Sequence, residues 1–449
     1  MQMLNIIEKK RDGLPLDADE IRFFIREYTA GAIPDYQAAA LLMAITLNGM
    51  TRAETVQLTL AMAQSGDMLD LSDISEYAVD KHSSGGVGDK TTLIVLPLVA
   101  SFGLPIAKMS GRGLGFGGGT VDKLESIRGF AVNLSESEFR RIARETGMVL
   151  AGQSKSLAPA DGLLYALRDV TGTVPSQPLI ASSIMSKKLA AGANGIVLDV
   201  KLGCGAFMKT LESARDLARV MVQIGVDAGR DMAALLSDMN QPLGVAVGNA
   251  LEVAEAVETL QGGGPADLRA HCIEVAAHML RLAGRGRRYV DLAENRELLA
   301  QQLDAGAGMQ PLLRMMAAQG GDVTQIQDAS RLPRAKLQEE FTARETGAVA
   351  AIYADKVGWA ALALGAGRAT KTDTIDHAVG IEVHVNVGDQ VAAGDRLMTV
   401  HANDEGKLAA ALTLLAEALA YSAEPVARLP LFHGVVDGAD FTTSPATIV

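Results

Sequence analysis

The chain has 449 residues, of which 48% are hydrophobic and 21% are charged, a balance typical of a globular protein with two or three domains. A formal net charge of −12 argues against a nucleic-acid-binding surface, so any phosphate site must be a local cationic patch. With two cysteines, a charged N-terminal stretch unlike a secretory signal, and no run approaching ~18 apolar residues, we expect a cytoplasmic protein without a membrane partner.

Residues 1–70 predict a small all-α domain. Asp17 and Thr51 each stand three residues before a glutamate, which is capping-box spacing, and apolar residues then recur at helical intervals. Short helices bury little surface by themselves. We therefore expect the helical segment within 161–194 to return to this domain.

From residue 75 the pattern alternates between strand, glycine loop and helix. This alternation predicts a large α/β domain with a mixed sheet flanked by helices, spanning 75–160 and 195–335. The predicted strands are LPIAKM, GMVLAG, IVLDVKLG and AALLSDMN.

Residues 340–435 predict a third unit, a C-terminal β-rich (α+β) module. Both GAVAAIYADKVGWAALAL and IEVHVNVGDQVAAGDRLMTVHA are interpreted as short alternating runs, the second with Gly-Asp turns. The last ten residues are expected to form a loose tail.

The stretch KHSSGGVGDKTT, residues 81–92, is the first candidate site. Its glycines allow successive backbone N–H groups to point at one anion, and a helix beginning near Thr91 adds its positive end. Further donors come from Lys81, Ser83 and Thr92. The alternative is a strand-to-helix turn without a ligand. A Walker A loop is excluded, because Asp89 separates Gly88 from Lys90.

A second glycine loop, SGRGLGFGGGT, covers residues 110–120. Its match to GxGxxG at Gly113, Gly115 and Gly118 is weak evidence by itself. Two glycine loops that both carry hydroxyl groups suggest one oxyanion held from two sides. Arg112 either faces that anion or bridges to Asp122 or Glu125 as part of the scaffold.

The chain resembles the thymidine/pyrimidine-nucleoside phosphorylase family in these two loops and in the stretch YALRDVTGTVPSQPLIASSIMSKKLAAG. The resemblance extends from residue 1 to about 430. It implies a helical and an α/β domain around a cleft, and a homodimer joined through the helical domain. It also implies phosphorolysis of uridine, deoxyuridine and thymidine to free base and (deoxy)ribose 1-phosphate in nucleoside salvage. Inorganic phosphate is then the co-substrate, and no organic cofactor is expected.

The resemblance also implies roles for individual residues. Arg168, Ser183 and Lys187 match the base-binding positions, and His82 matches a histidine that protonates or stabilises the base carbonyl. Alternatively, His82 satisfies a loop carbonyl. Lys188 is expected to be a surface charge. The implied phosphate-binding residues are Lys81, His82, Ser83, Thr92, Lys108, Met109, Ser110 and Thr120.

Lys108 bears on specificity. Thymidine-selective relatives tend to have an uncharged side chain at this point, whereas the broader enzymes have AKMSGRG, as here. A donor at this position favours a ribose 2′-hydroxyl, so we expect uridine to be accepted as well as thymidine.

Some family members carry a structural potassium ion. The matching positions are Gly88, Lys90, Leu243, Ala246 and Glu255. Backbone carbonyls and one carboxylate are suitable ligands for a hard cation. If Lys90 contributes only its carbonyl, the ion site survives. If its ammonium folds inward, it replaces the ion.

One departure from the family pattern predicts a lower activity or an altered specificity. The family commonly reads GLGHTGGT, but this chain has Phe116 and Gly117 in place of the His-Thr pair. Phe116 is expected to narrow the pocket or stack on the base. The alternatives are a thymidine-selective phosphorylase, a phosphoribosyltransferase of the anthranilate type with an acidic magnesium site, and a catalytically weakened nucleoside-binding homologue.

Overall fold

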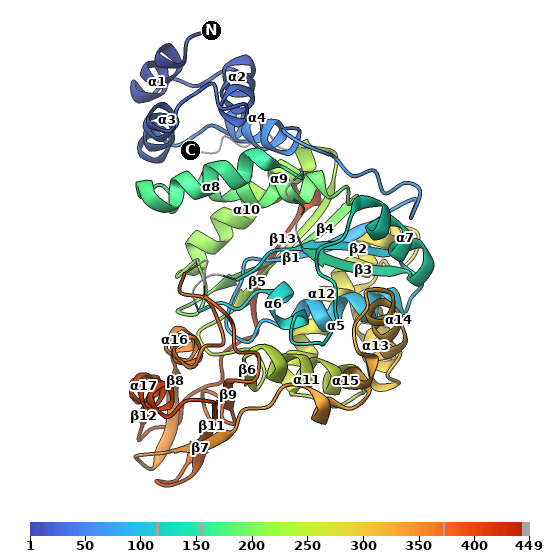
Figure 1. Cartoon of the computed structure of the whole chain (residues 1–449), viewed down its shortest axis with the longest axis vertical. Helices are drawn as coiled ribbons and strands as arrows, with labels where there is room; N and C mark the ends of the chain where they lie inside the picture. Colours follow the sequence, from blue (N-terminus) through green and yellow to red (C-terminus); the bar gives the residue numbers. More distant parts are fainter. Residues whose placement is uncertain (114–115, 153, 155, 371–372, 442–449) are drawn as a thin grey trace.

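A computed structural model describes residues 1–113, 116–152, 154, 156–370 and 373–441 (Figure 1). Within these residues, the predicted fold class is confirmed: a helical bundle, an α/β part with a mixed sheet, and a β-rich C-terminal part. No helix in this described part of the chain is both long and apolar enough to cross a membrane.

The helical part contains two segments that are distant in sequence. Its first segment comprises α1 (Met3–Arg11), α2 (Ala18–Thr29), α3 (Asp35–Asn48) and α4 (Arg52–Ala63). Asp17 and Thr51 form the predicted capping boxes. The second segment, α8 (Pro159–Thr171) and α9 (Gln177–Ala190), packs on the first, and Leu164 and Leu179 belong to the same hydrophobic cluster as Phe24. The two segments therefore share one core.

The central sheet has the strand order β1-β4-β5-β13. The strands are β1 (Val79–Ser83), β4 (Gly195–Leu202), β5 (Asp231–Asp238) and β13 (Phe432–Asp437). The first three run parallel, and β13 runs antiparallel to β5. The sequence pattern does not reveal β13, which carries the chain from the C-terminal part back to the central sheet. A separate parallel pair is formed by β2 (Ile106–Ser110) and β3 (Met148–Gly152).

Helices cover the sheet on both sides (Figure 1). The helices of the α/β part are α5 (Thr91–Ala100), α6 (Thr120–Leu124), α7 (Glu136–Thr146), α10 (Leu211–Asp227), α11 (Asn249–Leu260), α12 (Ala266–Gly284), α13 (Leu292–Asp304), α14 (Met309–Ala318) and α15 (Val323–Gln327), of which α10 and α12 contact both β4 and β5. A short 3-10 helix, η1 (Ala329–Arg331), follows. Because α5 and α10 each follow a parallel strand and its loop, their N-termini lie at the carboxyl edge of the sheet.

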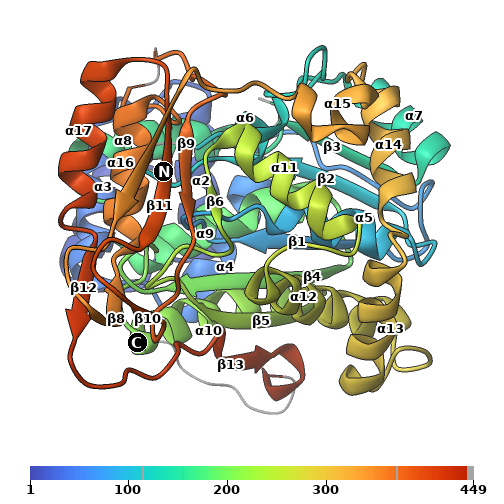
Figure 2. The same ribbon diagram turned by 90° about the horizontal axis from the view of Figure 1, so that it is seen from below.

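The C-terminal part contains two further antiparallel sheets. One has the order β6-β9-β11-β7 and the other β10-β8-β12. The strands are β6 (Ala246–Val247), β7 (Leu337–Thr342), β8 (Gly347–Ile352), β9 (Gly380–Val383), β10 (Gln390–Val391), β11 (Arg396–Ala402) and β12 (Leu419–Ser422). Figure 2 shows these strands beside α16 (Ala354–Leu364) and α17 (Glu405–Leu415). The last described element is η2 (Gly438–Phe441).

One sequence prediction in this part is wrong. The run GAVAAIYADKVGWAALAL is a strand only as far as Ile352, and α16 follows. Ala354, Val357, Ala361 and Leu364 are all buried at helical intervals, so the period is 3.6 and not 2. Trp359 on this helix contacts Phe116 of the second glycine loop.

Candidate active site

The first glycine loop is closed by polar contacts around Lys81, which is fully buried on β1. The Lys81 ammonium donates to the hydroxyl of Thr91 and lies 3.3 Å from that of Thr92. The Asp89 carboxylate accepts from Thr91 at 2.6 Å and also from Ser83. A cation therefore lies directly under the loop, at the start of α5.

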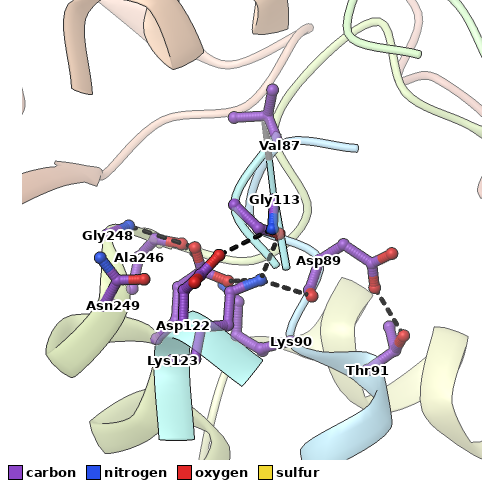
Figure 3. A network of polar contacts seen from close by, with 12 residues as sticks. Val87, Asp89, Lys90, Thr91, Gly113, Asp122, Lys123, Ala246, Gly248 and Asn249 are labelled. Carbon is purple, nitrogen blue, oxygen red and sulfur yellow. Dashed lines mark hydrogen bonds and ion pairs between the residues drawn. The ribbon is translucent and has the colours of Figure 1, made fainter. Parts of the chain in front are cut away.

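The two glycine loops lie against each other (Figure 3). Lys123 is buried on α6, which follows the second loop, and its ammonium donates to the carbonyls of Asp89 at 2.8 Å and Gly118 at 3.3 Å. A Cβ added to Gly117 would lie 3.7 Å from the Gly86 carbonyl oxygen. The loops are thus close enough to bind the same small anion.

The second loop is anchored by polar contacts with α6 and with the C-terminal part. Arg112 forms a bidentate ion pair with Glu125 at 2.5 and 2.7 Å, so it adopts the scaffold alternative. The Asp122 carboxylate accepts from the Gly113 amide and from Arg368 of the C-terminal part, both at 2.7 Å. Of the loop glycines, Gly115 lies outside the described residues.

Phe116 contacts the C-terminal part of the chain. Its ring centroid is 5.3 Å from that of Trp359 on α16. A Cβ added to Gly358 would meet the Phe116 ring at 2.9 Å, so the two segments are tightly packed. The aromatic residue in this unusual loop therefore attaches the loop to α16.

His82 lies among lysine side chains at the edge of the site. Burial, followed by the charges of Lys188, Lys108 and Lys187, lowers the pKa of His82 well below its ordinary value. Its ring makes no hydrogen bond to any described residue, so the alternative that His82 donates to a loop carbonyl does not hold for these residues. A neutral imidazole with both nitrogens available is suited to donate a hydrogen bond.

Asp80 holds two of these lysines in place. Its buried carboxylate lies 2.9 Å from the Lys188 ammonium and 3.2 Å from that of Lys108. Burial alone would raise the pKa of Asp80, but the two lysines hold it below its ordinary value. Lys188 is therefore a buried charge and not the surface charge expected from the sequence.

Lys108 donates to the Lys81 carbonyl as well as pairing with Asp80. Two of its three N–H groups are thus directed at the protein. Met109 and Ser110 follow it at the end of β2 and are half-buried. The hydroxyls of Ser110 and Thr120 make no hydrogen bond within the described part of the chain.

The predicted base-binding side chains lie together on α8 and α9. Arg168 is buried, and its guanidinium donates to the carbonyls of Thr173, Val174 and Leu179, which leaves two of its five N–H groups. Lys187 pairs with Asp161 at 2.7 Å and lies 3.4 Å from the Ser183 hydroxyl. The next residue on α9, Lys188, donates to Asp80 on β1 and lies 3.5 Å from the Met109 carbonyl on β2, so this group adjoins the strands that lead into the two glycine loops.

The positions that the resemblance implies for potassium surround an ammonium group. The Lys90 ammonium lies 3.0 Å from the Leu243 carbonyl and 2.7 Å from the Ala246 carbonyl, and it pairs with the Glu255 carboxylate. The backbone of Gly88 is packed against the same Leu243 carbonyl. The residues present do not fit a potassium ion beside this ammonium.

Comparisons with known proteins agree with this arrangement. Residues 4–66 match the family described as "Glycosyl transferase family, helical bundle domain", and residues 75–309 match "Glycosyl transferase family, a/b domain". Residues 348–422 match "Pyrimidine nucleoside phosphorylase C-terminal domain". A pyrimidine-nucleoside phosphorylase of Geobacillus stearothermophilus is 54% identical over 405 residues, which are 90% of this chain and 93% of that protein. The chain belongs to the pyrimidine-nucleoside phosphorylase family.

A second relative in this family comes from Staphylococcus aureus strain bovine RF122. It is 53% identical over 403 residues, covering 90% of this chain and 92% of that protein. Among solved structures, anthranilate phosphoribosyltransferase from Thermus thermophilus aligns with a TM-score of 0.58 at 19% identity. The alignment covers 70% of this chain and 99% of the phosphoribosyltransferase chain, and it shows only that the two proteins share a fold.

Three supporting residues of this phosphorylase-family site were not predicted from the sequence. They are Asp80, Lys123 and Asp161, which hold Lys188, the two loops and Lys187 respectively. Asp161 could have been predicted from the sequence, because it precedes Arg168 by about two helical turns and therefore lies on the same face of α8. Asp80 and Lys123 contact residues distant in sequence, and local pattern does not reveal such contacts.

Proposed function

We propose that this protein cleaves uridine, deoxyuridine and thymidine with inorganic phosphate, releasing the free base and (deoxy)ribose 1-phosphate. The observation that carries this proposal is the contact between the two glycine loops, with Lys81 beneath them and His82 and Lys187 beside them. The arrangement offers an anion site next to a cationic pocket for a departing heterocycle. Membership of the pyrimidine-nucleoside phosphorylase family supports the same reaction.

In the proposed reaction, phosphate lies in the two loops. Their backbone N–H groups, the start of α5 and the positive charge of Lys81 favour an anion there. Further contacts would come from Ser83, Thr92, Ser110 and Thr120, with Lys108 and Met109 lining the approach. A phosphate oxygen attacks C1′ of the pentose, and the C1′–N1 bond breaks through an oxocarbenium-like state.

The electron pair of the broken bond moves onto the base, where negative charge builds up at the carbonyl oxygens. Arg168 and Lys187 place positive charge near that position, and Ser183 adds a hydroxyl. Fixed donors of this kind lower the barrier. Because the pKa of His82 is lowered, its neutral ring acts as a hydrogen-bond donor to a base carbonyl, and the released base anion is protonated by water.

We propose that closure of the helical part onto the α/β part completes the site. The moving units would be 1–70 with 161–194, and 75–160 with 195–335. A homodimer through the helical part is supported by the apolar residues that α3 exposes on one face: Tyr36 at 75%, Met43 at 37% and Leu47 at 76%. Light scattering of the wild type and of Leu47→Glu tests this, with a dimer expected only for the wild type.

The experiment for the activity mixes the purified protein with uridine, thymidine or cytidine, with and without phosphate, and separates free base by chromatography. We expect uracil and thymine only when phosphate is present, together with pentose 1-phosphate. His82→Ala and Lys187→Ala should each lose about 100-fold or more in kcat/KM. Lys356→Ala is the matched control, because this lysine pairs with Glu417 on the surface of the C-terminal part.

The alternatives give different results in the same experiment. Release of thymine but not uracil would identify a thymidine-selective enzyme. Nucleoside binding without base release would identify a weakened homologue. In a parallel incubation with added phosphoribosyl pyrophosphate, consumption of that compound, with no phosphate-dependent cleavage of nucleosides, would identify a phosphoribosyltransferase and refute the proposal.

A further inference from the structure

We propose that the Lys90 ammonium is a built-in cation that permanently takes the place of a bound potassium ion, so that this protein needs no monovalent metal for its fold. Lys90 is fully buried between the first glycine loop and the segment that leads into β6. Its ammonium contacts the carbonyls of Leu243 and Ala246 and the carboxylate of Glu255.

The number of partners identifies the charged form of the side chain. An ammonium has three N–H donors, and the acceptors around Lys90 are two carbonyl oxygens and one carboxylate oxygen. A neutral amine has only two N–H donors and would direct a lone pair at the third acceptor. Carbonyl and carboxylate oxygens are also the ligands that hard metal cations prefer. The protein has therefore supplied the cation covalently.

Atoms are closely packed where Gly244 faces this ammonium. Gly244 has φ +70°, and a Cβ added there would lie 2.9 Å from a Glu255 oxygen and 3.2 Å from the Lys90 ammonium nitrogen. Glu255 also accepts from the amides of Val245 at 2.7 Å and Ala246 at 3.2 Å. The carboxylate is thus satisfied and its charge is balanced. A potassium ion added here would be a buried charge without a counterion, which is strongly unfavourable.

The presence of the Lys90 ammonium in place of an ion has a structural consequence for the first glycine loop. A bound ion dissociates when its concentration falls, but a lysine side chain does not. Lys90 therefore links the loop to a segment 153–165 residues further along the chain under all ionic conditions. The carbonyl of its neighbour Asp89 accepts from Lys123, so the same link supports the contact between the two loops.

The first test uses the wild-type protein. After dialysis into choline chloride, we expect less than stoichiometric potassium by elemental analysis, and equal thermal midpoints in KCl, NaCl and choline chloride of the same ionic strength. Crystals soaked in RbCl, a potassium substitute with anomalous scattering, should show no rubidium at Glu255. One potassium per chain, a higher midpoint in KCl, or a rubidium peak at Glu255 would each overturn the proposal.

The second test restores an ion site. Lys90→Ser removes the ammonium and offers a hydroxyl oxygen, so its midpoint in choline chloride should fall by roughly 10 °C. KCl should recover part of that loss, and rubidium should appear between Leu243 and Glu255. Lys90→Met, whose stem fills the space, is the control and should lose stability without recovery in KCl. A Lys90→Ser protein whose thermal midpoint does not respond to KCl would refute the proposal that the ammonium takes the place of a potassium ion. If this variant fails to fold, the test on the wild-type protein still decides. These measurements do not depend on the proposed activity.

Discussion

Replacing Lys123 with methionine removes an ammonium group that bonds to both glycine loops. This side chain is 1% exposed and donates to the carbonyls of Asp89 and Gly118. It also forms an ion pair of 3.0 Å with Glu252, which is likewise buried. Methionine keeps the length and apolar stem, so the substitution removes charge and hydrogen bonds with little change in volume.

The magnitude follows from what the methionine leaves behind. Removing one partner of a buried ion pair costs about 3–5 kcal/mol, because the remaining carboxylate has no counterion. The contact between the loops loses charge-assisted hydrogen bonds worth about 1.5–3 kcal/mol. If that energy positions the loops for phosphate, the affinity for phosphate should fall about 10- to 150-fold. Lys123→Met combined with Glu252→Gln should recover part of the stability and none of the affinity.

The assay measures urea unfolding and the KM for phosphate in parallel. Lys10→Met is the matched control, because Lys10 forms an equally buried pair with Glu54 at 2.7 Å in the helical part. It should lose comparable stability while its KM for phosphate stays unchanged. A Lys123→Met protein with reduced stability but a wild-type KM would refute the role of this lysine in joining the loops.

Two further predictions concern protonation and packing. Burial lowers the pKa of His82 and His271, so the folded chain binds fewer protons than the unfolded chain below pH 6.5. Unfolding free energy should therefore fall as the pH is lowered from 6.5 to 5, and constant stability in urea titrations over this range would contradict this. Gly358→Ala should destabilise the protein by about 1–3 kcal/mol and raise the KM for phosphate, because its Cβ would collide with Phe116. Gly162→Ala, in an open helical position of α8, should instead stabilise by about 0.5–1 kcal/mol, and equal effects of the two would exclude the collision.

The amino-acid sequence by itself determined the local structure. The capping boxes at Asp17 and Thr51 formed as predicted, because a cap depends on residues three positions away. The glycine loops followed for a similar reason, since Gly85 and Gly88 adopt positive φ values of 92° and 71°. Such features are encoded within a few residues.

Only the tertiary structure decided where the long charged side chains end. The sequence left the position of the Lys90 ammonium open and wrongly predicted an exposed Lys188, and each proved to be buried against an acceptor more than 100 residues away. The same holds for β13, which completes the central sheet, and for Phe116, which packs on Trp359. A flexible lysine or an edge strand takes its position from the partners that the assembled fold brings within reach, and these partners leave no periodic signal in the sequence nearby.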